Sequence, residues 1–595
     1  MKKAEIDGID FYTYFKSGAE EVKRHKDHLN KINVFPVKDG DTGTNLAITM
    51  NCIAEETTVS EDFNIVIKSM SNAAFENARG NSGIIFASFL GGFHRACGHL
   101  KSLTMEQFSQ GATLAVSEAY SAVSTPVEGT MLTVIREWSE YIEKSHKTHH
   151  HFSDLFEGAY LKAKQVLDET PDMLEILKRH KVVDSGAKGF VMFLEGFNKL
   201  IDEIIHKSSE TDTESGAVDI EHDRGQIEVP NFRYCTEVLL YADINNKSHI
   251  ESLMSDLGDS GIVTGNESMM KIHIHTNTPD VLTKRLIENG YKVNKSKVED
   301  MFVQADVERQ AKSKIAILTD SIADLAADQI LKDQVHVLPL SLIADDSVYL
   351  DKLTATKDNI ATILDYSKVY PTSSQPDVKQ VRVKLEWLLG LYEHVIVISV
   401  AKALSGTFST FERTISEFGE DSNRVTLVDS KLNSGAQGLI VMEAVKMANR
   451  GESLENILDK IKEDIPKTSI YVSLDTFKYA VQGGRVPNKI GNVLMKLNAK
   501  PIMSLNEEGQ GTAFGLAFSR RSIDKKIIKH VKKIIASEGI DKYAIVHAGN
   551  PELAERYRRI FEELIGKSPA ISTDISAITT IHAGIGAVAI ALTRR

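Results

Sequence analysis

The sequence predicts a multidomain protein: an all-helical domain, then a small α/β middle domain, then a larger α/β part. A chain of 595 residues is far longer than one hydrophobic core usually organises. Apolar residues recur at helical spacing over about residues 9–206, whereas later residues alternate short apolar runs with helical stretches. A polar segment separates these two patterns.

The helical pattern is clear at Phe63, Ile67 and Met70, which repeat at the spacing of one helix face. We therefore predict a helical domain over residues 1–206. Residues 207–229 hold almost no apolar side chains to bury, so this segment is predicted to be a linker.

A small α/β domain is predicted over residues 230–312. Residues 233–241 and 269–275 alternate like strands, and residues 248–257 have helical spacing. After this domain, each apolar run is followed by a turn and a helical stretch. These runs are residues 314–319, 335–342, 394–399 and 424–429. Because buried parallel strands read as continuous apolar runs, residues 313–595 are predicted to hold a doubly wound sheet and, from about 468, a further α/β unit.

Composition narrows the functional classes. With 70 basic and 82 acidic side chains the formal charge is −12, which argues against general affinity for nucleic acid or anionic membranes, although local basic patches are compatible with it. Three cysteines, Cys52, Cys97 and Cys235, cannot form a disulfide framework. Glu5 and Asp7 interrupt the start of the chain where a signal peptide needs an unbroken apolar stretch, and no later run is long enough for stable membrane insertion. We therefore expect a cytoplasmic protein.

The most informative motif is the loop in which Asp39 and Asp41 flank Gly40. Residues two apart on a helix do not face each other, so the two carboxylates converge only if Gly40 and Gly43 allow a tight turn. Hard oxygen ligands in such a turn suit Mg²⁺ bound to nucleotide phosphates. The alternative is a solvated turn that only caps the following helix.

The residues after this loop could bind the phosphates themselves. Thr42 and Thr44 offer hydroxyl donors, and a helix beginning near Asn45 would present free backbone amides to an anion. Three later segments also place glycines at predicted helix starts: Arg79–Gly83, Glu128–Met131 and Asp184–Gly189. Such glycines let amides approach a phosphate closely, but each segment alone could equally be a tight turn or a helix cap.

These four motifs, in this order, resemble the DhaL-type (DAK2) kinase domain of the ATP-binding subunit of bacterial fatty acid kinase, over about residues 10–200. The resemblance implies a helical barrel that binds Mg-ATP. Dihydroxyacetone kinases of this type use three carboxylates, and the upstream position here is Asn33. The implied sites are Asp39, Asp41 and Asn33 on the metal, Thr42, Thr44, Asn45, Asn81, Ser82 and Gly83 near the phosphates, and Thr130, Met131 and Asp184 around the nucleoside. Phosphoryl transfer needs mainly positioning and charge neutralisation, so no covalent nucleophile is required.

A second candidate site lies in the middle domain. His273 and His275 are two residues apart in a strand, so they project from one face, and Cys235 could approach from a neighbouring strand. One thiolate and two imidazoles suit zinc. Alternatively, the histidines bond to backbone carbonyls and Cys235 packs as a small hydrophobe. The fatty acid kinase subunit carries a similar Cys and His-X-His, which implies a metal or phosphoryl-transfer role for His273 and His275.

The third candidate site combines Ser373, Ser405 and His582. Hydroxyl and imidazole donors can hold a carboxylate at the mouth of an apolar tunnel without burying a full counter-charge. Ser405 is not within a Gly-X-Ser-X-Gly elbow, so we do not interpret it as a hydrolase nucleophile. Its alternative role is to cap the following helix.

Residues 313–595 resemble the DegV family of fatty-acid-binding proteins through their Thr-Asp-Ser, Leu-Ser-Gly-Thr-Phe, Gly-Gly-Arg-Val and His-Ala-Gly segments. The resemblance implies an EDD fold, in which two α/β subdomains clasp one fatty acid. The family pattern Thr-Ser-X-Pro is replaced here by Ser373-Ser374-Gln375-Pro376, so either Thr372 or Ser373 supplies the first hydroxyl.

The predicted function is ATP-dependent phosphorylation of a fatty acid bound by the DegV-like domain of the same chain, giving an acyl phosphate. Mg-ATP is the expected cofactor, with zinc in the middle domain, and a homodimer is expected from the family. Separate acyl-carrying or acyltransferase proteins would be further partners. Two alternatives stay open: a lipid-binding or lipid-sensing protein with an inactive kinase domain, and a dihydroxyacetone-type kinase acting on a small hydroxyketone.

Overall fold

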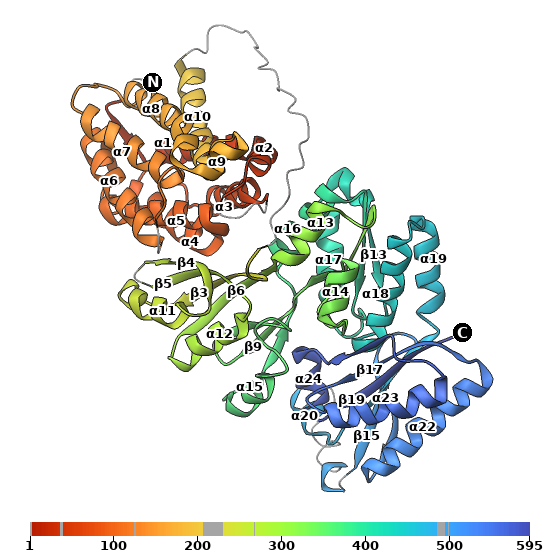
Figure 1. Ribbon diagram of the computed structural model, residues 1–595. Helices are drawn as coiled ribbons and strands as arrows, with labels where there is room; N and C mark the ends of the chain where they lie inside the picture. Colours follow the sequence, from red (N-terminus) through yellow and green to blue (C-terminus); the bar gives the residue numbers. More distant parts are fainter. Residues whose placement is uncertain are drawn as a thin grey trace. The chain divides into compact units, whose positions relative to one another are not determined.

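The computed structural model describes residues 3–35, 40–123, 126–205, 230–266, 268–484, 494–497 and 499–595. Contacts divide the chain into two compact units. The first unit holds Met1–Thr278 and Glu288–Met301, and the second holds Pro279–Ile287 and Phe302–Arg595. The predicted fold class is confirmed: a helical part is followed by a small α/β part and a larger α/β part (Figure 1). The predicted linker over residues 207–229 lies outside the described residues.

The amino-terminal part of the first unit is helical (Figure 1). It also holds a short two-stranded sheet made of β1 and β2. Its elements are β1 (Glu5–Asp7), α1 (Gly8–Arg24), α2 (Lys26–Lys31), α3 (Thr42–Glu56), α4 (Phe63–Asn77), α5 (Gly80–Cys97), β2 (Ser102–Thr104), α6 (Met105–Ala122), α7 (Met131–Ser145), α8 (Phe152–Met173), α9 (Glu175–His180) and α10 (Ser185–Ile205). Aromatic rings fill its core: the Phe86 and Phe193 centroids are 5.1 Å apart, and those of Phe15 and Phe193 are 5.3 Å apart. Edge-to-face rings at these distances add packing energy beyond their buried area.

The helices of this domain begin in two different ways. Helices α1 and α6 begin with capping boxes, made by Asp7 with Asp10 and by Thr104 with Gln107. Helices α3, α5 and α7 lack such a hydrogen bond from their own N-cap side chains in the described structure. These are three of the helices that follow the predicted phosphate motifs. Their first amides are therefore left for other partners.

The middle domain contributes a four-stranded antiparallel sheet to the first unit, in the order β4-β5-β3-β6. Its elements there are β3 (Tyr234–Tyr241), η1 (Ile244–Asn246), α11 (Lys247–Met254), β4 (Gly258–Gly265), β5 (Met269–Thr276) and β6 (Lys292–Asp300). The predicted strands over residues 233–241 and 269–275 correspond to β3 and β5. Ile262 of β4 belongs to the same hydrophobic cluster as the core of the helical domain. Sheet and helices of the first unit thus share one core.

The second unit is built on a parallel sheet, β13-β12-β7-β8, a three-stranded antiparallel sheet, β10-β9-β11, and a mixed six-stranded sheet, β16-β15-β14-β19-β17-β18. The predicted strands over residues 314–319, 394–399 and 424–429 correspond to β7, β12 and β13. The prediction of one strand over residues 335–342 is wrong, because β8 and β9 belong to different sheets. Pro339 lies between them and lacks the N–H that a continuous strand would need.

The elements of the second unit run in chain order through both α/β subdomains (Figure 1). They are α12 (Pro279–Glu288), α13 (Met301–Arg309), β7 (Ile315–Asp320), α14 (Ala327–Asp333), β8 (His336–Leu338), β9 (Ser341–Ala344), β10 (Ser347–Leu350), α15 (Ile360–Tyr366), β11 (Thr372–Ser374), α16 (Val378–Leu391), β12 (His394–Ser399), α17 (Thr407–Ser416), η2 (Gly419–Arg424), β13 (Val425–Asp429), α18 (Ser434–Asn449), α19 (Leu454–Asp464), β14 (Thr468–Ser473), α20 (Lys478–Gln482), β15 (Lys500–Leu505), β16 (Gly511–Ala517), α22 (Arg520–Ser537), β17 (Ile540–His547), α23 (Pro551–Ile565), β18 (Ile571–Asp574), α24 (Ala577–Ala583) and β19 (Val588–Arg594). Among the described helices of both units, none combines the length and the apolar character needed to cross a membrane.

Candidate functional site

The described residues of the predicted metal loop begin at Gly40 and lead into α3. Gly40 has a φ of +66°, a left-handed conformation that favours glycine. The Asp41 carboxylate accepts a hydrogen bond of 2.7 Å from Asn45 Nδ2. Asn30 of α2 fixes Thr44 on both sides, because its Oδ1 accepts from the Thr44 amide at 3.0 Å and its Nδ2 donates to the Thr44 hydroxyl at 2.8 Å. Sequence reasoning missed Asn30, since an asparagine in a short helix gives no signal of its own.

Helix α5 begins directly against α3. Gly80 has a φ of +58°, and a Cβ added there would lie 2.7 Å from Asn45 Nδ2. The Thr49 hydroxyl accepts a 3.1 Å hydrogen bond from the Arg79 amide, and a Cβ on Gly83 would come within 2.7 Å of the same hydroxyl. The glycines of this motif therefore allow close packing of α5 on α3. The Gly83 amide already donates to the Arg79 carbonyl at 3.1 Å.

Helices α7 and α10 bring the remaining two motifs to the same place. A Cβ on Gly186 would lie 2.8 Å from the Ser82 hydroxyl and 3.4 Å from the Met131 Cβ. Asp184 caps α10, since its Oδ1 accepts from the Ala187 amide at 2.8 Å. The starts of α3, α5, α7 and α10 thus converge, and the positive ends of several helix dipoles favour an anion there.

Burial affects two residues at these helix starts: it changes the pKa of Asp184 and keeps water away from the Asn81 Oδ1. Asp184 is 5% exposed, and burial raises the pKa of its carboxyl to about 6, although backbone amides of Ala187 and Met131 oppose the shift. The Asn81 Oδ1 is buried without a hydrogen-bond partner among the described residues, so it is available to a bound molecule. The Thr130 hydroxyl donates to the Val127 carbonyl at 2.8 Å.

Asp39, Asn33 and Thr42 are the other residues predicted for the metal and the phosphates. Asp39 lies outside the described residues. Asn33 is buried just after α2, where its amide donates to the Asn30 carbonyl at 3.3 Å. Thr42 is half-buried as the first residue of α3. Their roles on the metal and the phosphates stay predictions.

The structure brings Cys235, His273 and His275 together on one face of the middle sheet. Cys235 pairs with His275 across β3 and β5, and one ligand atom from each of the three residues lies within 4.8 Å of the others. The Cys235 Sγ and the His273 Nδ1 are 3.9 Å apart. In tetrahedral zinc sites the ligand atoms are roughly 3.3–3.8 Å apart, so a small closure would complete the set.

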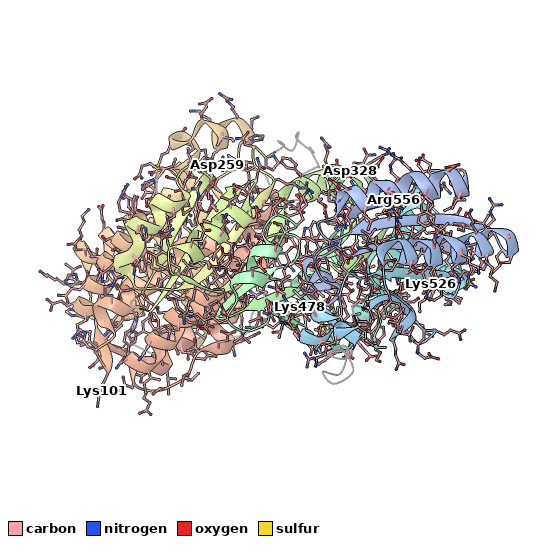
Figure 2. The ribbon with its side chains drawn as sticks, turned by 90° about the horizontal axis from the view of Figure 1, so that it is seen from below. Lys101, Asp259, Asp328, Lys478, Lys526 and Arg556 are labelled. Atoms are coloured by element: carbon pink, nitrogen blue, oxygen red, sulfur yellow. The ribbon has the colours of Figure 1, made fainter. Side chains whose placement is uncertain are left out.

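The donor chemistry of this cluster fits a metal ion. The His273 Nε2 is buried without a hydrogen-bond partner among the described residues. Burial and neighbouring His273 lower the pKa of His275 to about 3, which keeps its imidazole in the neutral form that binds metals. The Asp259 carboxylate, labelled in Figure 2, lies 3.5 Å from the His275 Nδ1 and can orient that ring.

Charged residues that sequence reasoning missed surround the cluster. Glu237 and Lys271 share its sheet face, and the Lys271 Nζ is 3.2 Å from the Glu237 Oε2. Burial alone would raise the pKa of Glu237, but the nearby side chains of Lys271, Lys297 and His273 hold it well below its usual range. Strand alternation could have placed these residues on the face of Cys235. Their partners on other strands depend on register, which the sequence does not reveal.

The cluster lies beside the convergent helix starts within the first unit. The Glu237 Oε1 accepts a 2.8 Å hydrogen bond from the amide of Gly80, the first residue of α5. Nearby, the hydroxyls of Ser88 and Thr264 are 2.7 Å apart. Burial raises the pKa of the Cys235 thiol well above its usual range, and the Asp41 carboxylate is among the charges that raise it further. Asp41 is therefore within electrostatic range of the Cys235, His273 and His275 cluster.

The second unit positions Ser405 at the start of α17. Its hydroxyl oxygen accepts from the Thr407 amide at 3.2 Å and lies 2.8 Å from the Thr407 hydroxyl. A Cβ on Gly406 would lie 2.2 Å from Gln375 Nε2, and the Gln375 Oε1 accepts from Thr410 at 2.9 Å. Gln375 therefore ties the segment that carries Ser373 to the segment that carries Ser405.

Helix α24 carries His582 and is anchored at its amino end by buried carboxylates. Asp351 accepts a 2.7 Å hydrogen bond from the Ala577 amide and a 2.6 Å bond from the Ser321 hydroxyl. Asp324 accepts from the Ser576 amide at 2.9 Å. These contacts join the two α/β subdomains and fix the start of the helix.

The three predicted carboxylate donors come from neighbouring segments. Helix α24 contacts β11, which carries Ser373 in an exposed position. An apolar cluster common to these segments includes Leu342, Tyr349, Ile363, Val400, Ile578 and Ile581. Apolar side chains therefore lie close to the segments that carry Ser373 and His582, as an acyl site requires. The contact of each donor with a ligand stays a prediction.

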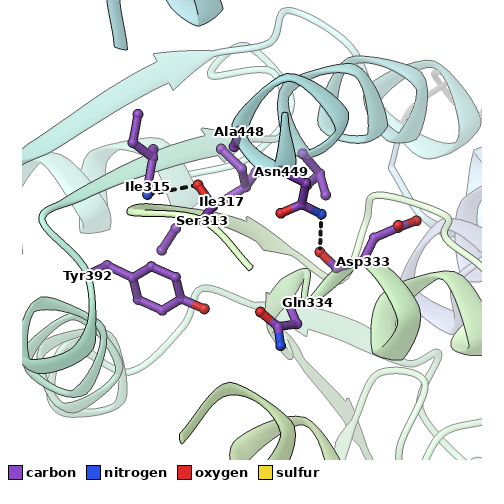
Figure 3. Close-up of a pocket in the computed structure, with 10 residues that line it drawn as sticks. Ser313, Ile315, Ile317, Asp333, Gln334, Tyr392, Ala448 and Asn449 are labelled. Carbon is purple, nitrogen blue, oxygen red and sulfur yellow. Dashed lines mark hydrogen bonds between the residues drawn. The ribbon is translucent and has the colours of Figure 1, made fainter. Parts of the chain in front are cut away.

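A small hollow in the same unit lies elsewhere (Figure 3). It is lined at the amino end of β7 by Ile315, with Gln334, Tyr392 and Asn449 around it. Ligands of open α/β sheets bind outside the carboxyl ends of the strands. Thr319 and Ser321 mark that end of β7, so this hollow is not the candidate acyl site.

Comparison with known families matches almost the whole chain. The DAK2 domain model matches residues 36–199, the FakA-like middle domain model, named for fatty acid kinase, matches residues 231–308, and the DegV family model matches residues 314–595. The resemblances noted from the motifs are thereby confirmed. One chain therefore matches a DAK2 domain model, a FakA-like middle domain model and a DegV family model, in that order.

Individual relatives add detail. An uncharacterised protein of Staphylococcus saprophyticus is 35% identical over 312 residues, which are 50% of this chain and 56% of that protein, so the match spans about half of the relative. An uncharacterised protein of Staphylococcus aureus is 29% identical over 448 residues, 72% of this chain and 80% of that protein. Among solved structures, a fatty-acid-binding DegV-family protein of Thermus thermophilus is 25% identical, with a TM-score of 0.43 over 47% of this chain and 99% of that one. A fatty-acid-binding DegV-family protein of Streptococcus agalactiae is 26% identical, with a TM-score of 0.42 over 48% of this chain and 99% of that one.

Proposed function

We propose that this protein transfers the γ-phosphoryl group of ATP to a fatty acid held by its own DegV domain. One observation carries the proposal. The 2.8 Å hydrogen bond between Glu237 and Gly80 joins the Cys235, His273 and His275 cluster to the helix starts that resemble a nucleotide site. The matches to a DAK2 domain and a fatty acid kinase-like middle domain support a kinase.

In this proposal Asp39 and Asp41 hold Mg²⁺, and the convergent helix starts bind the phosphates of ATP. An oxygen of the acyl carboxylate attacks the γ-phosphorus, the bond from that phosphorus to the β–γ bridging oxygen breaks, and ADP leaves. The products are an acyl phosphate and ADP. Positioning and charge neutralisation supply the catalysis, so the chain needs no covalent nucleophile.

Cys235, His273 and His275 would hold a zinc ion, with Asp259 orienting His275. The ion would supply a fixed positive charge and Lewis acidity beside the reacting oxygens. Lys271, 6% exposed, keeps a further cation on the same sheet face.

Ser373, Ser405 and His582 would bind the fatty acid carboxylate in the second unit. The anchoring of α24 by Asp351 and Asp324 would hold His582 in place. The transfer could run within one chain or between two chains of a homodimer. Mixing a variant that lacks Asp41 with a variant that lacks His582 separates these cases, because only transfer between chains restores activity.

The test is the formation of ADP by the purified chain with Mg-ATP and oleate, compared with Mg-ATP and dihydroxyacetone. We expect ADP formation that depends on the fatty acid. ADP formation that depends on dihydroxyacetone instead would favour a hydroxyketone kinase. Bound fatty acid without any binding of ATP would favour a lipid sensor.

A further inference from the structure

Glu237 contacts both halves of the candidate site in the first unit. Its Oε1 accepts from the Gly80 amide at 2.8 Å and lies 3.9 Å from the His273 Nδ1. We propose that Glu237 sets the affinity for nucleotide: its carboxylate occupies the start of α5 and repels phosphate until a metal ion in the Cys235, His273 and His275 cluster neutralises it. This inference rests on the proposed function, because it takes the nucleotide and metal sites from it.

On the nucleotide side, Glu237 accepts a hydrogen bond from an amide that a bound phosphate would otherwise use. Gly80 is the first residue of α5, whose own N-cap side chain makes no capping hydrogen bond in the described structure. Its amide is therefore one of the donors that have no acceptor within the helix and make a helix start attractive to anions. A carboxylate on that donor competes with phosphate and repels it through its charge.

The contact also reaches the acidic loop. A Cβ on Gly80 would touch Asn45 Nδ2 at 2.7 Å, and the same nitrogen donates to Asp41 at 2.7 Å. A change in the position of Gly80 would therefore shift Asn45 and, through its hydrogen bond, Asp41 of the predicted metal loop.

On the cluster side, Glu237 faces His273 across the β3–β5 pairing and is 1% exposed. Carboxylates beside metal-bound histidines orient the imidazole and share the charge of the metal. A divalent ion here would draw the Glu237 carboxylate and cancel its repulsion of phosphate. Metal and nucleotide would then favour each other's binding, and linkage requires the two effects to be equal in size.

The direction in which Glu237→Gln changes the ATP affinity of the zinc-free chain separates this role from a merely structural one. Calorimetry on the full-length chain would measure Mg-ATP affinity with zinc bound and after chelation of zinc. In the unmodified chain we expect chelation to weaken ATP binding at least fivefold. In Glu237→Gln, we expect the zinc-free form to bind ATP at least fivefold more tightly than the zinc-free unmodified chain. A structural role predicts weaker binding instead.

Matched variants separate the loss of this particular carboxylate from two simpler causes of such a shift. Glu299→Gln also removes a carboxylate from this sheet face, where Glu299 pairs with Lys297 at 2.7 Å. It should leave the zinc dependence of ATP binding unchanged. Glu237→Gln leaves Lys271 without its carboxylate partner, so the double variant Glu237→Gln with Lys271→Gln tests whether a free lysine or a loss of folding causes the effect. It should show the same tighter zinc-free binding.

The outcomes are distinct. Equal ATP affinity with and without zinc in the unmodified chain would overturn the inference and leave the proposed kinase activity standing. Weaker ATP binding by both Glu237 variants would also overturn it. Absence of ATP binding to the zinc-loaded chain would overturn the proposed function and this inference together.

Discussion

The candidate site in the first unit and the candidate acyl site in the second unit differ in charge: the first contains charged side chains in contact, and the second contains mainly neutral donors. In the first, full charges meet directly: Glu237 contacts Lys271 at 3.2 Å and a helix amide at 2.8 Å. In the second, the candidate donors Ser373, Ser405 and His582 are neutral or weakly basic, and the buried carboxylate Asp351 serves to anchor a helix. A site for a nucleotide must balance several charges, whereas a site for one carboxylate can rely on dipoles.

The comparison predicts that removing a charge from the first site has the largest effect. Asp41→Asn should lower the rate of phosphoryl transfer about 1,000-fold, because the Mg²⁺ that neutralises the phosphates loses a ligand. The rate is measured as fatty-acid-dependent ADP formation, and fatty acid binding should stay unchanged. Asp27→Asn, an exposed carboxylate on the neighbouring α2, is the control. Full activity in Asp41→Asn would contradict the metal-loop assignment.

The anchor of α24 predicts a pH dependence of stability in the second unit. Burial raises the pKa of Asp351 to about 6, against the opposing effects of Lys352 and Ser321, whereas the unfolded value is about 3.9. Between these values the folded state binds more protons, so the free energy of unfolding falls as pH rises from about 4 to about 6. The loss from this group is about 3 kcal/mol.

Asp351→Asn should remove this part of the pH dependence, since an amide keeps an acceptor for the Ala577 N–H. Trp138 and Trp387 are the two tryptophans of the chain. With Trp138→Phe, urea unfolding followed by Trp387 fluorescence therefore reports on the second unit. An unchanged pH profile in Asp351→Asn would show that other groups, such as Asp320, carry the effect.

The metal cluster predicts an intermediate effect on activity. Cys235→Ser should lower the zinc content measured by elemental analysis at least tenfold, and activity by about 100-fold, because a neutral hydroxyl is a poor ligand for zinc. Cys52→Ser alters a cysteine outside the cluster and should retain zinc. If Cys235→Ser kept both zinc and activity, His273 and His275 would have a structural role only.

The smallest effect is expected at the acyl site. Ser405→Ala should raise the KM for the fatty acid about tenfold and leave the KM for ATP unchanged, because one hydrogen bond to a charged group contributes about 1.5–3 kcal/mol. Ser416→Ala, at the other end of α17, is the control. An equal change in both KM values would contradict the separation of the two sites.

Much of this organisation could be predicted from local pattern. Helical spacing identified the first domain, and strand alternation placed Cys235, His273 and His275 on one face. The motif order identified helix starts that do converge, as the contacts of Gly80 and Gly186 show. These predictions depend on neighbours in sequence, where backbone geometry fixes the direction of a side chain.

What could not be predicted depends on contacts between distant residues. Glu237 and Gly80 are 157 positions apart, and no local pattern links a strand carboxylate to a particular helix amide. Asn30 acts on Thr44 from a separate helix. The error at residues 335–342 has a local cause, since Pro339 was a visible signal for a strand boundary that the apolar run obscured.

The most direct test is to trap the product. The purified chain is incubated with Mg-ATP labelled in the γ-phosphate, oleate and hydroxylamine, which converts an acyl phosphate to a hydroxamate. We predict labelled phosphate release together with oleoyl hydroxamate, both lost in Asp41→Asn. No hydroxamate from a chain that demonstrably binds both Mg-ATP and oleate would contradict the account.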